Sequence, residues 1–106
     1  MPPVGMNPGL GLGGGFLASS SGAIYTPLQG QSTVVNELFI RNTGVASEAC
    51  VFTTTSGLSL KAVLEAGEQA SIFDNENTLS MAPGDILSGS ATNASVVAYK
   101  VGGSRT

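Results

Sequence analysis

The chain has 106 residues and a formal net charge of −3, and charged residues make up 10% of it, against about a quarter in average globular proteins. This length suits one domain with a modest core. The four basic residues, Arg41, Lys61, Lys100 and Arg105, are scattered along the sequence, whereas nucleic-acid binding requires a stripe of positive charge against the phosphates. The composition therefore excludes nucleic acid as a partner and indicates a surface that is largely covered by protein neighbours.

Residues 1–22 differ in composition from the rest, with three Pro, seven Gly and no charged residue. Gly costs backbone entropy and Pro lacks a hydrogen-bond donor, so this stretch favours neither helix nor sheet. It is nevertheless apolar, whereas disordered tails are usually polar and charged. We interpret it as an extended N-terminal arm that becomes ordered on assembly, and the alternative is a disordered tail. The expected contacts of the arm with a neighbouring subunit are Leu10, Leu12, Phe16 and Leu17.

The remainder of the chain changes to the two-residue period of β-strands. In residues 33–42, for example, Leu38 and Ile40 share one face with Val34, as expected for a strand with one buried side. Turn sequences separate such segments. At Pro-Gly-Asp 83–85, Pro fixes one φ and Gly accepts a positive one. Besides a short strand before Thr26, the predicted strands span residues 33–42, 48–55, 58–64, 70–73, 79–82, 86–91 and 94–101.

This pattern of short strands with frequent turns predicts an all-β fold, an antiparallel β-sandwich that is jelly-roll-like. The predicted organisation is an arm over residues 1–22, a sandwich domain over 23–103 and a C-terminal tail over 104–106. The side chains expected to face inward are Val34, Leu38, Ile40, Leu60, Leu64, Ile72, Leu79, Val97, Tyr99 and Val101. A sandwich this small has edge strands with few charges to guard them, which favours self-association as a symmetric dimer or trimer.

The sequence offers few groups for catalysis. It contains no His and one Cys, so the usual nucleophile–base pairs, a zinc site and an internal disulfide are all excluded. Cys50 lies in an apolar run, and we expect it to be a small buried hydrophobe. Most of the seven acidic residues lie at turns or strand ends and are interpreted as solvated loop charges. We therefore expect no catalytic residue, no cofactor and no metal, and predict that the protein is not an enzyme.

Two motif-like stretches carry little weight. Residues 9–14 match the spacing GxGxxG, but no strand precedes them and no helix follows. The polar loop 74–77 offers oxygen atoms, yet lacks the spacing and downstream Glu of a calcium loop. No apolar run reaches the length of about 18 residues that a membrane helix needs, and the Gly-interrupted residues 9–18 lack the basic start of a signal peptide. We therefore expect no membrane partner and synthesis in the cytoplasm.

The sandwich portion resembles a family of small β-sandwich structural proteins of tailed bacteriophages. The shared pattern begins with a short strand ending in Tyr-Thr at 25–26 and a turn containing Pro and Gly at 27–30. A long strand then closes in Asn-Thr-Gly at 42–44, and an Ala-Gly-Glu turn follows at 66–68. Finally, a Pro-Gly-Asp turn at 83–85 leads into a strand of small residues.

The resemblance covers residues 23–103 and leaves the arm outside. It departs from the family at residues 27–30, where Pro-Leu-Gln-Gly stands in place of the common Val-Pro-Ala-Gly. Such proteins serve as capsid decoration (cement) proteins and as tail components. The resemblance implies a protein of the virion, at the capsid surface, that binds the major capsid protein. The first alternative is a tail, neck or fibre-base protein of the same fold. A carbohydrate-binding module is disfavoured, because Trp is absent and only Tyr25 and Tyr99 offer phenolic stacking faces.

Overall fold

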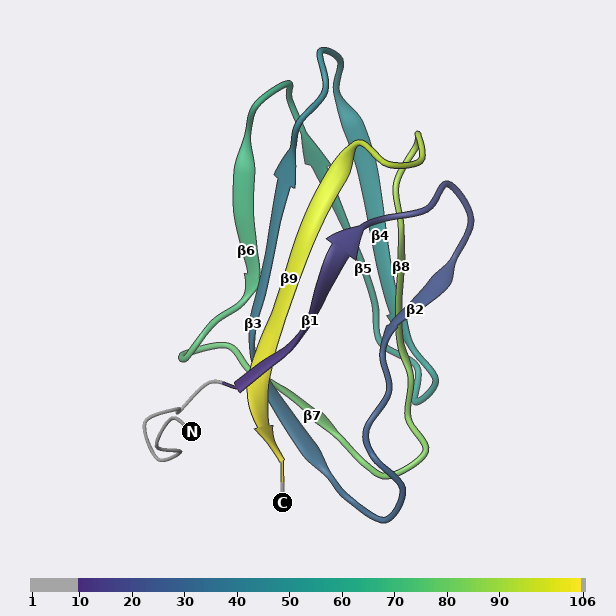
Figure 1. Cartoon of the computed structure of the whole chain (residues 1–106), viewed down its shortest axis with the longest axis vertical. Coiled ribbons are helices and arrows are strands. Elements are labelled where there is room, and N and C mark those ends of the chain that lie inside the picture. Colours follow the sequence, from purple (N-terminus) through teal and green to yellow (C-terminus); the bar gives the residue numbers. More distant parts are fainter. Residues whose placement is uncertain (1–9, 106) are drawn as a thin grey trace.

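The computed structural model describes residues 10–105 and shows an all-β domain of two packed sheets (Figure 1). The predicted β-sandwich is confirmed, and β3 to β8 begin and end close to where the alternation placed them, whereas β9 begins and ends later than the predicted 94–101. The strands are β1 (Leu10–Phe16), β2 (Gly22–Tyr25), β3 (Thr33–Asn42), β4 (Glu48–Thr54), β5 (Ser59–Leu64), β6 (Gln69–Phe73), β7 (Leu79–Met81), β8 (Leu87–Ser90) and β9 (Val97–Arg105).

The strand order identifies the sandwich as a jelly roll. One sheet, which we call sheet A, has the order β1-β9-β3-β6, and the short β7 also pairs with β3. The other, sheet B, has the order β2-β8-β4-β5. The pairings within both sheets are antiparallel. Without β7, the remaining eight strands follow the double Greek-key path of a jelly roll. The loops between strands therefore gather at the two ends of the long axis (Figure 1).

The core lies between the two sheets and contains most of the expected side chains. Five of them are buried, namely Leu38, Ile40, Leu64, Val97 and Val101. Four others are partly buried and pack against the core, namely Leu60, Ile72, Leu79 and Tyr99. Cys50 is fully buried, as predicted, beside Phe52. Val34 is the exception: its side chain is 38% exposed, whereas the neighbouring Val35 is fully buried.

A β-bulge in β3 explains why Val34 faces outward. Where β3 pairs with β9, the register shifts between Val35 and Glu37, so Val35 lies opposite Gly103 and Glu37 opposite Gly102. The extra residue reverses the phase of the alternation, and Val35 therefore shares the inner face with Leu38. A Cβ added at Gly103 would overlap the backbone carbonyl oxygen of Val34. The close approach of the two backbones at the bulge therefore requires a glycine.

The predicted boundary between arm and sandwich at residue 22 is wrong. Residues 10–16 form β1, which pairs with β9 from Leu10 opposite Gly103 to Phe16 opposite Ala98. In a jelly roll this is the first strand, so it belongs to the domain itself. The chain then enters the core at Leu17, whose side chain is 1% exposed. Residues 1–9, where the rest of the expected arm falls, lie outside the described residues.

The predicted C-terminal tail over residues 104–106 is also wrong for its first two residues. Ser104 and Arg105 continue β9 and pair with Val34 and Thr33 of β3. The Arg105 Nε donates a hydrogen bond of 3.3 Å to the Tyr25 hydroxyl, which itself shares a hydrogen bond of 2.8 Å with the Thr33 hydroxyl. The last strand is thus tied to both ends of the β2–β3 connection. Within residues 10–105, no helix is long and apolar enough to span a membrane.

Candidate functional site

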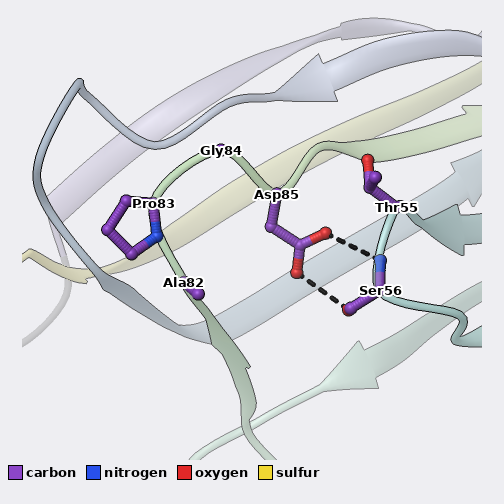
Figure 2. Close-up of a pocket in the computed structure, with 6 residues that line it drawn as sticks. All are labelled: Thr55, Ser56, Ala82, Pro83, Gly84 and Asp85. Carbon is purple, nitrogen blue, oxygen red and sulfur yellow. Dashed lines mark hydrogen bonds between the residues drawn. The ribbon is translucent and has the colours of Figure 1, made fainter.

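A shallow pocket of about 250 Å³ lies at one loop end of the sandwich, between the β4–β5 turn and the β7–β8 turn (Figure 2). It is lined by Thr55, Ser56, Ala82, Pro83, Gly84 and Asp85. Gly84 has a positive φ of 89°, which confirms that the glycine of Pro-Gly-Asp 83–85 takes the positive φ that the turn requires. Asp85 is the one ionisable group among these six residues, so the pocket brings no second acid or base to it.

Asp85 is buried, at 6% exposure, and both carboxylate oxygens accept hydrogen bonds. Its Oδ1 accepts from the backbone N–H groups of Ser56 and Ile86, each at 3.1 Å. Its Oδ2 accepts from the Ser56 hydroxyl at 2.9 Å. Figure 2 shows the Asp85 carboxylate pointing at Ser56. The expectation of a solvated loop charge is wrong for Asp85, which joins two turns that are distant in sequence.

Glu48 holds a second pair of segments together, where β4 begins. Its side chain is 2% exposed, and its two oxygens accept hydrogen bonds of 2.8 Å from the backbone N–H and the side-chain amide of Asn93. The Ala49 N–H also donates to the Thr92 hydroxyl at 3.0 Å. Glu48 therefore fixes the β8–β9 loop, and it too departs from the expectation of a solvated charge.

Cys50 lies two residues along β4 from Glu48. Burial raises the pKa of the Cys50 thiol above its ordinary value, and the negative charge of Glu48 raises it further. A thiol needs a lowered pKa to act as a nucleophile at neutral pH. The surroundings of Cys50 therefore act against reactivity, in agreement with its interpretation as a core residue.

The polar loop after β6 is a turn stabilised by its first residue. The Asp74 Oδ1 accepts hydrogen bonds of 2.9 Å from the backbone N–H groups of Glu76 and Asn77. A carboxylate that bonds backbone groups two and three residues ahead forms a common turn motif. In the described part of the chain, no group of three His, Cys, Asp or Glu residues is arranged to hold a metal ion.

Of the four expected arm contacts, the structure leaves Phe16 open to a partner, with a side chain that is 55% exposed. Leu17 belongs to the core, and Leu12 is partly buried against it. The side chain of Leu10 lies outside the described residues. Leu17 therefore cannot act as a contact in this fold, and the predicted interaction set does not form one surface.

The exposed large apolar side chains are spread over several surfaces. They are Phe16, Leu28, Val34, Val45, Val63 and Ile86, with Val45 98% exposed. Val63 lies on the edge strand β5 of sheet B, and Phe16 at the end of β1 in sheet A. Leu28 and Ile86 lie in the β2–β3 and β7–β8 connections.

Sequence reasoning did not single out one further aromatic residue, Phe39. It is half-buried between the fully buried Leu38 and Ile40 of β3, so its side chain lies on the outer face of sheet A. The available signal was an aromatic residue between Glu37 and Arg41, on the face that alternation assigns to solvent.

Comparison of the chain with protein-family models, with curated proteins and with solved structures finds no match.

Proposed function

We propose that the chain is a structural protein of a virus particle. It acts as a capsid decoration protein that binds the outside of the head and stabilises contacts between major capsid subunits. Its action is binding alone: buried area at the contacts favours the assembled state by mass action. The protein is made in the host cytoplasm, takes its place on the capsid surface and performs no catalysis.

The observation that carries this proposal is the placement of the exposed apolar side chains on separate surfaces. Phe16 and Val63 lie on different sheets, and Val45 lies at the tip of the β3–β4 loop, at one end of the long axis (Figure 1). A protein that bridges two neighbours needs at least two contact surfaces, and exposed apolar area marks such surfaces. The jelly roll agrees with this role because capsid proteins use it, although lectins use it as well.

The alternatives differ in how well the structure suits them. A tail, neck or fibre-base protein would use the same kind of surfaces and remains the second proposal. A carbohydrate-binding module loses its stacking faces, because Tyr25 is 6% exposed and hydrogen-bonded to Thr33. Tyr99 is partly buried and packs against the core. Both phenolic rings are therefore engaged in packing or hydrogen bonding within the domain, which disfavours this alternative.

The test is to image virus particles by negative-stain electron microscopy with and without the chain, and to measure co-sedimentation of the purified chain with bare heads. A decoration protein should bind heads saturably, with added density spread over the shell. Added density confined to the tail or neck would favour the second proposal. Absence of binding to every part of the particle would contradict both proposals.

A truncation of the purified chain tests whether the first residues help the binding. Removing residues 1–22 would also remove β1 and Leu17, so the correct truncation removes residues 1–9 and leaves the described sandwich intact. We expect this variant to keep its circular dichroism spectrum and melting temperature and to bind heads at least tenfold more weakly, about 1.4 kcal/mol. Undiminished binding would mean that the described sandwich carries the whole contact.

A further inference from the structure

The exposed acidic residues gather along one edge of the sandwich. Of the seven acidic residues, Glu48 and Asp85 are buried, and Glu37 is half-buried at the β3 bulge. The other four are exposed and lie at the two ends of the edge strand β6, in the β5–β6 turn and in the loop after β6 (Figure 1). We call them the acidic edge, and they are Glu65, Glu68, Asp74 and Glu76.

A second surface on the same molecule carries the opposite charge. On the outer face of sheet A, Ala98 of β9 lies between Phe16 of β1 and Arg41 of β3. One step along the sheet, Lys100 of β9 lies opposite Phe39 of β3. We call these five residues the aromatic–cationic face, and the half-buried Glu37 lies at its margin, two residues before Phe39 on the same side of β3. Within residues 10–105, neither Arg41 nor Lys100 forms an ion pair, and both are exposed.

We propose that the aromatic–cationic face binds the acidic edge of a second copy of this chain. The two surfaces have opposite charge, and such complementarity selects and orients a partner. Phe16 is 55% exposed, and with Phe39 it supplies the apolar area that becomes desolvated at the centre of a contact. The contact does not depend on the proposed virion role, because both surfaces belong to the isolated chain.

The placement of the charges disfavours direct packing of two aromatic–cationic faces. Two aromatic–cationic faces packed against each other would bring Arg41 and Lys100 against their own copies, which like-charge repulsion disfavours. The face of one copy can instead contact the acidic edge of another, either once, head to tail, or twice about a two-fold axis. The first arrangement closes into a ring when the rotation between copies allows, and the second gives a dimer.

The experiment reverses each surface in a separate full-length variant. The face variant is Arg41→Glu with Lys100→Glu. The edge variant is Glu65→Lys with Glu76→Lys, because the Glu68 and Asp74 carboxylates accept backbone hydrogen bonds within their turns. The edge variant has a net charge of −3 + 4 = +1. Long-range repulsion therefore cannot explain a failure of this variant to assemble.

Oligomer mass is measured by sedimentation velocity and light scattering over a range of protein and salt concentrations. We expect the wild-type chain to assemble and to dissociate as salt screens the contact. Each variant alone should stay monomeric and folded by circular dichroism, and an equimolar mixture should form mixed oligomers in a 1:1 ratio. The control Lys61→Glu, on the outer face of sheet B, should assemble like the wild type.

Three results would overturn the proposal. The first is a wild-type chain that stays monomeric at low salt and high concentration, which would leave the face for a different protein. The second is an edge variant that assembles like the wild type, because a face-to-face dimer would not need the acidic residues. The third is a mixture of two folded variants that stays monomeric.

Discussion

Substitution of Gly89 by Ala tests how the core of the sandwich is packed. Gly89 lies on β8, and an added Cβ would come within 2.9 Å of two ring carbons of Phe52 and 3.2 Å of a methyl carbon of Leu17. Both neighbours are fully buried, at 0% and 1% exposure. The ring and the methyl group have no free space into which to move, so the substitution should force side chains off their preferred rotamers or shift the backbone.

The expected cost follows from the kind of strain. Extra atoms in a well-packed core typically destabilise by about 1–3 kcal/mol. The matched control is Gly22→Ala, because Gly22 lies directly opposite Gly89 in the β2–β8 pair. There, the nearest atom to an added Cβ is the Ser20 carbonyl oxygen, at 4.0 Å. That substitution should be neutral or stabilise by up to about 1 kcal/mol, since it lowers the entropy of the unfolded chain.

Thermal and urea unfolding followed by circular dichroism measure the difference between the two variants. In a domain of this size, 1 kcal/mol shifts the melting temperature by about 4–8 °C. Phe52→Leu removes the ring, so Gly89→Ala should cost less in that background, with a coupling energy of at least about 0.5 kcal/mol. Equal melting temperatures for Gly89→Ala and Gly22→Ala would refute the packing described here, as would a cost unchanged by Phe52→Leu.

Three further predictions concern the buried groups. Leu17→Ala should lower the free energy of unfolding, measured in urea, by about 2–5 kcal/mol, as expected for a core leucine. Surface changes cost less than about 0.5 kcal/mol, and a loss that small would restore the interpretation of Leu17 as part of an arm. Asp85→Ala should cost about 1–3 kcal/mol, because backbone N–H groups lose their acceptor, whereas Asp85→Asn keeps an acceptor and should cost less; equal costs would contradict the role of the carboxylate. The Cys50 thiol, whose pKa is raised, should react with a thiol reagent much more slowly in the native than in the unfolded chain. The free energy of unfolding should also fall as the pH rises through the range in which the thiol of the unfolded chain ionises, because the folded state disfavours the charged thiolate. Rapid native labelling would contradict its burial.

Local signals were sufficient for much of the fold. The period of two and the turn residues predicted strands such as β3 and β5 close to their observed limits, because turn chemistry and alternation depend on neighbouring residues alone. The absence of a helical period excluded helices on the same ground. The burial of Cys50 was also predictable, because it lies in an apolar run of a predicted strand and Cys is a small hydrophobe.

Other features depended on pairing between residues far apart in the sequence. The glycine-rich residues 10–16 have little tendency of their own to form a strand, and they form β1 because β9 offers an edge and Leu17 fills the core behind them. Low intrinsic preference therefore led to the wrong boundary at residue 22. The correct boundary required knowing that β9 lies alongside, with paired residues from Leu10 and Gly103 to Phe16 and Ala98.

The sequence by itself determined that this is an all-β chain with an apolar core, few charges and no pair of groups for the usual catalysis. The tertiary structure alone decided which face Val34 takes, because the bulge that reverses the alternation forms only where Gly103 lets two backbones approach. It also decided that Asp85 is buried, since the donors of Ser56 reach it from another turn. A burial pattern repeats along one strand, whereas a bulge or a carboxylate bridge needs a partner from a distant segment, and only the folded chain brings the two together.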